Sequence, residues 1–280
     1  DTLKLLEKFN DSKTLFYPKG NEEDLNHLLK HVSSQPIAGL FTEFPSNPML
    51  SSVDLITLRR MANKYHFPIV TDNTLGALIN TSAHEISDIS TISLTKYFSG
   101  TGNVMGGALL LNPNQPYFYM LKPLLDSVYE KEGCCSADLM ALDENSNQID
   151  SRIKKINENT LEIVSYLNNH PKIENVWHPS ITDRPLYDQF IKEEGGYGGL
   201  LSFTLKNPEA NTIPFYDELQ ICKGPNLGTS FSLCCPFVML AHYSELDWTR
   251  QLGISKWLIR LSIGLEQPQD IIQRIHKALS

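Results

Sequence analysis

The sequence predicts an α/β fold, with a mostly parallel sheet followed by a smaller α+β region. Two observations predict this. Short apolar runs alternate with helical patterns over the first half of the 280-residue chain, and after Pro113 this alternation gives way to longer polar, helix-prone segments. Strands separated by helices form βαβ units, whose strands are parallel. We place the boundary near residue 140, in a helical connector, which gives two domains, 1–140 and 141–280.

The first half is expected to contain two amphipathic helices and four strands. Leucines at helical spacing predict a helix over about residues 22–32. The pattern "SSVD", Ser51 to Asp54, is a capping box that is expected to open a second helix. Strands are predicted in the apolar runs "IAGLFTEF", "FPIVTDN", "DISTISL" and "GALLLN".

The second half has a different order of elements. Residues 136–169 are polar and predict helix, and further helices are expected near 209–219 and after Pro268. Strands are predicted in "KIENVWHP", "GGLLSFTLK" and "WLIRLSIGLE". Together these elements predict the α+β domain.

Composition excludes several classes of partner. The net charge is −8 and no basic stretch runs along the chain, so we expect no nucleic-acid partner. No apolar run reaches the length of a membrane span. Five cysteines without a secretory signal indicate reduced thiols, and therefore a cytoplasmic protein. We also expect no metal site, because His27 and His31 share a helix face without the glutamate of an H-E-x-x-H motif.

A lysine and an aspartate are expected at the carboxyl edge of the predicted sheet. Asp72 ends one strand and Lys96 follows the next, and ligands of open α/β sheets bind at this edge. A desolvated lysine there can form a Schiff base with an aldehyde. If the aldehyde is pyridoxal phosphate, Asp72 is suited to pair with its ring nitrogen, and the hydroxyls of Ser93 and Thr95 are suited to its phosphate. Taken singly, each residue also fits an ordinary role, a solvated lysine or a turn-forming aspartate.

A series of motifs runs over nearly the whole chain. In order they are "EFPSNPML", "TDNTLGAL", "SLTKYFSGTGNVMGG", "WHPS", "GGLLSFTLK", "GPNLGTSFSL" and "IRLSIGLE". Together and in this order they resemble the Cys/Met-metabolism family of pyridoxal phosphate enzymes, and most closely its fungal-type cystathionine gamma-synthases.

The resemblance implies the fold of the aspartate-aminotransferase type and a role for each matching residue. Lys96 is the expected catalytic residue, which holds the cofactor and then moves protons on the substrate. Asp72 is expected at the ring nitrogen, and Ser93 and Thr95 at the cofactor phosphate. Asn47 is expected near the ring hydroxyl or the substrate carboxylate.

Two further residues are implied at the substrate. Arg260 is expected to clamp the substrate α-carboxylate, since a guanidinium binds a carboxylate through two hydrogen bonds. Asn226 replaces a usual serine beside this carboxylate site. Thr101 and Asn103 stand where the family usually has His and Asp, and Phe231 replaces a usual glutamate. These departures concern the choice of substrate.

The expected function is the γ-replacement of an O-acylhomoserine by cysteine to give cystathionine, in a dimer-based tetramer. The alternatives are a cystathionine or methionine lyase of the same family, and a catalytically inactive fragment or paralogue with a structural or regulatory role. Family members carry an upstream section with a Tyr-x-Arg pair, a glycine-rich turn and a stacking tyrosine around the cofactor. These motifs do not occur in this sequence, so we expect this polypeptide alone to bind the cofactor weakly or not at all.

Overall fold

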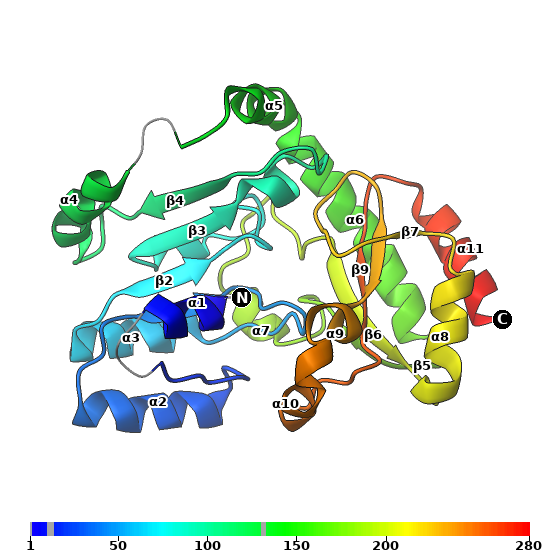
Figure 1. Cartoon of the computed structure of the whole chain (residues 1–280), viewed down its shortest axis with the longest axis horizontal. Helices are drawn as coiled ribbons and strands as arrows, with labels where there is room; N and C mark the ends of the chain where they lie inside the picture. Colours follow the sequence, from blue (N-terminus) through cyan, green and yellow to red (C-terminus); the bar gives the residue numbers. More distant parts are fainter. Residues whose placement is uncertain (1, 10–13, 130–132) are drawn as a thin grey trace.

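Two β-sheets form the frame of the molecule (Figure 1). The computed structural model describes residues 2–9, 14–129 and 133–280. The first sheet has the strand order β1-β2-β3-β4 and the second has the order β5-β6-β9-β8-β7. The long helix α6 (Ile149–Asn168) leads from the first half of the chain into the second.

The first sheet confirms the predicted parallel arrangement. Strands β1 to β3 run parallel, and β4 pairs with β3 in the antiparallel direction. The strands are β1 (Leu40–Glu43), β2 (Ile69–Asp72), β3 (Ile89–Ser93) and β4 (Gly107–Leu111). Helices α2 (Glu22–Ser34) and α3 (Leu55–Tyr65) supply buried side chains to the core on one face of this sheet.

The start of α3 corrects one prediction. The residue that caps the helix is Asp54, the last residue of the "SSVD" pattern, and not Ser51. The Asp54 carboxylate accepts a hydrogen bond from the backbone N–H of Thr57 at 2.9 Å. A carboxylate at this position satisfies a free N–H group and also lies favourably in the helix dipole.

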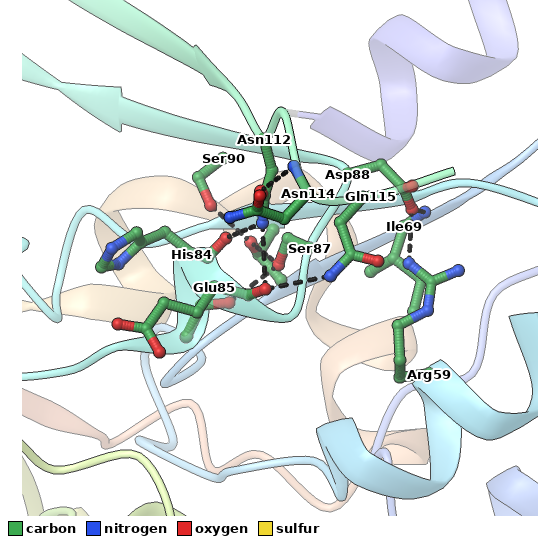
Figure 2. A network of polar contacts seen from close by, with 12 residues as sticks. Arg59, Ile69, His84, Glu85, Ser87, Asp88, Ser90, Asn112, Asn114 and Gln115 are labelled. Carbon is green, nitrogen blue, oxygen red and sulfur yellow. Dashed lines mark hydrogen bonds and ion pairs between the residues drawn. The ribbon is translucent and has the colours of Figure 1, made fainter. Parts of the chain in front are cut away.

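A buried ion pair ties α3 to the sheet (Figure 2). Arg59 donates to Asp88 at 2.6 Å, and the same carboxylate oxygen accepts from the backbone N–H of Ile69 at 2.7 Å. In the same view, Asn112 and Gln115 donate to the carbonyl oxygen of Glu85 at 2.9 and 3.0 Å. These contacts join α3 to β2 and to the residue before β3, and they join the turn after β4 to the turn at Glu85.

The second sheet is mostly antiparallel and densely covered. Helices α6, α8 (Pro208–Glu218) and α11 (Pro268–Leu279) pack against it, and every residue of β6 and β9 is buried. The strands are β5 (Ile173–Trp177), β6 (Leu200–Leu205), β7 (Cys222–Lys223), β8 (Leu233–Pro236) and β9 (Ile259–Ser262).

Several short elements complete the chain. The helices are α1 (Thr2–Phe9), α4 (Phe118–Val128), α5 (Ser136–Ser146), α7 (Arg184–Tyr187), α9 (Phe237–Ala241) and α10 (Leu246–Gln251). Single turns of 3₁₀-helix lie at η1 (Ala83–Glu85) and η3 (Tyr243–Glu245). No residue of α4 is buried although its sequence is largely apolar. None of the helices in the described ranges combines the length and apolar composition that crossing a membrane requires.

The two halves of the chain share a hydrophobic cluster. It contains Leu75 and Tyr97 from the first half and Ile156, Leu200 and Leu227 from the second. Tyr97 is only 2% exposed, so the residue after the predicted catalytic lysine is fixed inside this shared core. The boundary near residue 140 remains a prediction.

Candidate active site

The carboxyl ends of β1, β2 and β3 bring acidic and hydroxyl groups together. Glu43 and Asp72 are neighbours in the register of β1 and β2. Asp72 accepts a hydrogen bond from the backbone N–H of Thr74 at 2.8 Å, and the Thr74 hydroxyl accepts from the backbone N–H of Ser93 at 2.9 Å. The edge predicted from the sequence therefore exists, with Asp72 and Ser93 linked through one threonine.

Lys96 lies in an interrupted helical turn directly after β3. The turn, η2 (Leu94–Phe98), is broken at Lys96, whose φ of −87° and ψ of −123° are not helical. The Thr95 hydroxyl accepts a hydrogen bond from the backbone N–H of Gly106 at 3.1 Å, which braces the turn against the start of β4. The backbone on the N-terminal side of Lys96 is therefore held to the start of β4 by a hydrogen bond.

The amine of Lys96 is half-buried and has a hydrogen-bond partner. Its Nζ atom donates to the side-chain oxygen of Asn226 at 2.5 Å. Burial, and to a smaller extent the charge of Arg260, lower the pKa of Lys96 below its ordinary value. A larger share of the amine is then uncharged near neutral pH, and only the uncharged amine is a nucleophile.

The loop that carries Asn226 touches the lysine turn from the side of the second sheet. Gly228 has a φ of +75°, and a Cβ atom there would lie 2.6 Å from the backbone nitrogen of Tyr97. Only glycine combines this conformation with such a close approach. The second half of the chain therefore contacts Lys96 directly.

Arg260 is a buried cation whose contacts are neutral. It is 4% exposed and donates to the side-chain oxygen of Asn47 at 3.1 Å and to the carbonyl oxygen of Pro225 at 2.5 Å. Its guanidinium lies 4.8 Å from the centre of the Phe237 ring. Among the described residues no carboxylate forms an ion pair with it. A buried guanidinium without a fixed anion is suited to bind a carboxylate from outside.

Sequence reasoning missed Glu43. Its carboxylate accepts a hydrogen bond from the backbone N–H of Asn47 at 2.8 Å, and so supports the turn that presents Asn47 to Arg260. The pKa of Glu43 is raised above its ordinary value, mainly by burial. The hydrogen bond from Asn47 opposes this rise, and the charge of Asp72 adds to it. The available signal was its place at the end of a predicted strand, the same signal that identified Asp72.

The predicted site residues lie in one connected patch. Lys96 donates to Asn226, and the preceding residue Pro225 accepts from Arg260. Arg260 also donates to Asn47. Asn47 donates to Glu43, which lies opposite Asp72 in the strand register. Their individual roles remain predictions. The residues of the patch that the sequence singled out are Asn47, Asp72, Ser93, Thr95, Lys96, Asn226 and Arg260.

These groups fit pyridoxal phosphate. Lys96 supplies an amine of lowered pKa for an aldehyde. Asp72 uses one carboxylate oxygen for Thr74, and no hydrogen bond to the other is found within the described ranges, which leaves an acceptor for a protonated ring nitrogen. A lysine of lowered pKa and a carboxylate at the carboxyl edge of a parallel sheet suit an enzyme that binds an aldehyde cofactor through a lysine.

The comparisons with known proteins identify the family. The sequence model of the Cys/Met metabolism PLP-dependent enzymes matches residues 2–280. This chain therefore belongs to that family.

Two curated relatives and one solved structure show how the similarity is distributed. The chain is 41% identical to the cystathionine gamma-synthase of Neurospora crassa and 38% identical to that of Saccharomyces cerevisiae. Each match covers all of this chain and 45% of the relative, so the chain spans about half the length of both. A crystal structure of the Xanthomonas oryzae enzyme superposes with a TM-score of 0.85 at 24% identity, over 99% of this chain and 71% of that one. This likeness confirms the predicted fold.

Proposed function

We propose that this chain carries the cofactor lysine of a pyridoxal-phosphate-dependent transferase that replaces the γ-substituent of an activated homoserine ester with cysteine. The observation that carries the proposal is the Lys96 amine, held by Asn226 with its pKa lowered by burial and by Arg260. The similarity to two cystathionine gamma-synthases supports the choice of reaction.

The proposed roles follow from the geometry. When bound, pyridoxal phosphate withdraws electrons from the carbon atoms near the substrate amino group. Lys96 would take the proton from the substrate Cα atom and return protons at neighbouring carbons, because its Nζ atom is a base of lowered pKa. Asp72 would hold the proton on the ring nitrogen.

Arg260 would orient the substrate. Both of its terminal nitrogens now donate to neutral acceptors, the side-chain oxygen of Asn47 and the backbone oxygen of Pro225. A carboxylate that replaces one of these acceptors would gain a charge-assisted hydrogen bond and neutralise a buried charge. We therefore assign the α-carboxylate end of the substrate to the space beside Asn47 and Asn226.

The proposal extends to assembly and location. We infer small amino-acid substrates, a homo-oligomer built from dimers, and a cytoplasmic protein whose domains meet near residue 140. The exposed apolar side chains of α4 support association. Cys134, Cys135 and Cys222 are exposed and unpaired, as suits a reducing compartment.

Reductive trapping tests the proposal. The purified chain is mixed with pyridoxal phosphate, reduced with borohydride and mapped by mass spectrometry, with Lys154→Gln as an exposed-lysine control. Because the upstream cofactor motifs of the family do not occur in this sequence, we expect a low yield of adduct, all of it on Lys96, which Asp72→Ala lowers further. Labelling spread over surface lysines, with none on Lys96, would contradict a cofactor lysine at this position.

Turnover in the loaded protein then separates the reactions. Consumption of cysteine with an O-acylhomoserine indicates the transferase. Release of a keto acid from cystathionine or methionine indicates a lyase of the same family, and near-normal turnover in Asp72→Ala would contradict both.

A further inference from the structure

An arginine from the second half of the chain reaches the turn that carries Lys96. Arg152 lies in the first turn of α6. Its Nη2 atom donates to the carbonyl oxygens of Tyr97 at 3.0 Å and Phe98 at 2.6 Å, and its Nη1 atom donates to the carbonyl oxygen of Asn145 at 3.1 Å. One guanidinium therefore binds the two residues that directly follow the lysine.

The carbonyls that Arg152 binds need an external donor. The helical turn η2 ends at Phe98 and the chain then bends away at Gly100, so a continuing helix does not use these oxygens. A cation at the carboxyl end of a helical turn also interacts favourably with its dipole. Arg152 meets both needs at once.

The charge of Arg152 has no acidic partner. No ion pair of Arg152 occurs among the residues that the structure describes. Burial lowers the pKa of its guanidinium, so its position there costs free energy that the three carbonyl oxygens offset in part. Its Nε atom is buried without a hydrogen-bond partner among the described residues. Arg152 therefore binds the backbone of the lysine turn and is not part of a surface ion pair.

The fit around Arg152 is tight. Gly100 has a φ of +72°, and a Cβ atom there would lie 2.4 Å from the Nε atom of Arg152. The backbone N–H of Gly100 donates to the carbonyl oxygen of Lys96 at 2.8 Å. The side chains of Ile153 and Ile156, one and four positions further along α6, are buried in the cluster that also contains Tyr97. The helix and the lysine turn therefore form one packed unit.

We propose that Arg152 is a positioning residue for Lys96, which fixes the turn so that the amine stays beside Asn226 and Arg260. The use of Lys96 in catalysis rests on the function proposed above. The positioning itself does not, and it is tested without cofactor.

The test measures the titration of Lys96 in the full chain. Competitive acetylation with acetic anhydride over a range of pH is followed by mass spectrometry of the Lys96 peptide. It gives the titration midpoint of Lys96, the pH at which half of its amine is uncharged. Release of the turn would return the amine to water and away from Arg260. In Arg152→Gln we expect the midpoint to rise by about one pH unit, which means about tenfold less free amine at a given pH.

Two variants separate positioning from a general loss of structure. Arg152→Lys keeps the charge but not the forked donor, and we expect a midpoint between those of the wild type and Arg152→Gln. In Arg152→Ala, guanidinium ions at a concentration that leaves the wild type unchanged should restore the midpoint. Lys155→Gln, which removes a partly exposed cation from the same helix, should leave the midpoint at the wild-type value.

The proposal is overturned by a folded Arg152→Gln protein with the wild-type midpoint. If that variant does not fold, a wild-type midpoint in Arg152→Lys overturns it equally. Failure to trap pyridoxal phosphate at Lys96 would contradict the proposed function and leave this measurement intact, since no cofactor takes part in it.

Discussion

The second sheet and the outer edge of the first sheet are built from similarly apolar sequences but are buried very differently. Strands β6 and β9 are buried at every residue, under three helices. Strand β4 leaves Leu109 48% exposed, and α4 beside it has no buried residue. Burial is therefore densest at the centre of the second sheet, whereas the first sheet is covered mainly on the face that α2 and α3 pack against and is thinly covered at its β4 edge.

The largest effect is expected at the buried ion pair of the α3 face. Arg59→Met would leave the Asp88 carboxylate buried without its cation. We expect the free energy of unfolding to fall by about 4 kcal/mol, because an uncompensated buried charge is costly. Urea denaturation followed by circular dichroism measures this change. A loss below about 1 kcal/mol would show that the α3 face does not carry the first sheet.

A matched pair of leucines tests the comparison directly. Leu201 in β6 is fully buried, and Leu109 in β4 is half exposed. Truncation to alanine should lower the free energy of unfolding by about 3 kcal/mol at Leu201 and by less than about 1 kcal/mol at Leu109. Equal losses in the same denaturation experiment would mean that β4 is covered in solution.

A buried histidine after β5 gives the second region a pH dependence. His178 is fully buried, with hydrogen bonds to Ser180 and to the carbonyl oxygen of Gly198, and burial lowers its pKa from 6.5 to about 4. Between these values the unfolded chain binds a proton that the folded chain does not. The contribution of His178 to the free energy of unfolding is therefore fully present above pH 6.5. It should fall by about 1.4 kcal/mol per pH unit as the pH drops toward 4.

The variant His178→Gln isolates this contribution, because the carboxylates titrate in both proteins. Thermal unfolding of the two proteins from pH 7 to pH 4 should show a difference that changes with pH. A constant difference would mean that the pKa of His178 is the same in the folded and the unfolded chain.

The smallest effect on folding is expected at α4. Tyr119 and Leu124 are exposed, so Tyr119→Ser and Leu124→Ser should change the free energy of unfolding by less than about 0.5 kcal/mol. If this face mediates association, both variants should instead shift the sedimentation velocity toward smaller species. Destabilisation by more than 2 kcal/mol, with unchanged sedimentation, would place the face inside the fold.

Much of the fold could be predicted from apolar patterns. The strands with continuous apolar runs and the amphipathic helices occur where the sequence predicts them, since burial on a sheet face or helix stripe leaves a periodic trace. The two-residue strand β7 and the proline-ended β8 leave no such trace, and α4 carries Pro123 within it. Strands β7 and β8 are defined by their pairing with each other and with β9.

The same distinction holds at the candidate site. Asp72 and Lys96 were predictable because strand ends meet at one sheet edge. Arg152 was not, since it lies 55 residues after Tyr97 and only the fold brings its guanidinium to that carbonyl. Glu43 is the first residue of the motif "EFPSNPML", but only the structure shows that its carboxylate accepts a hydrogen bond from the backbone N–H of Asn47.

The shared cluster around Tyr97 has a consequence for dissecting the molecule. A cut near residue 140 would leave Leu75 and Tyr97 on one fragment and Ile156, Leu200 and Leu227 on the other, so each piece would expose half of a hydrophobic core. Two such fragments, expressed together, are expected to find each other and rebuild the lysine turn by complementation, whereas either one alone would aggregate.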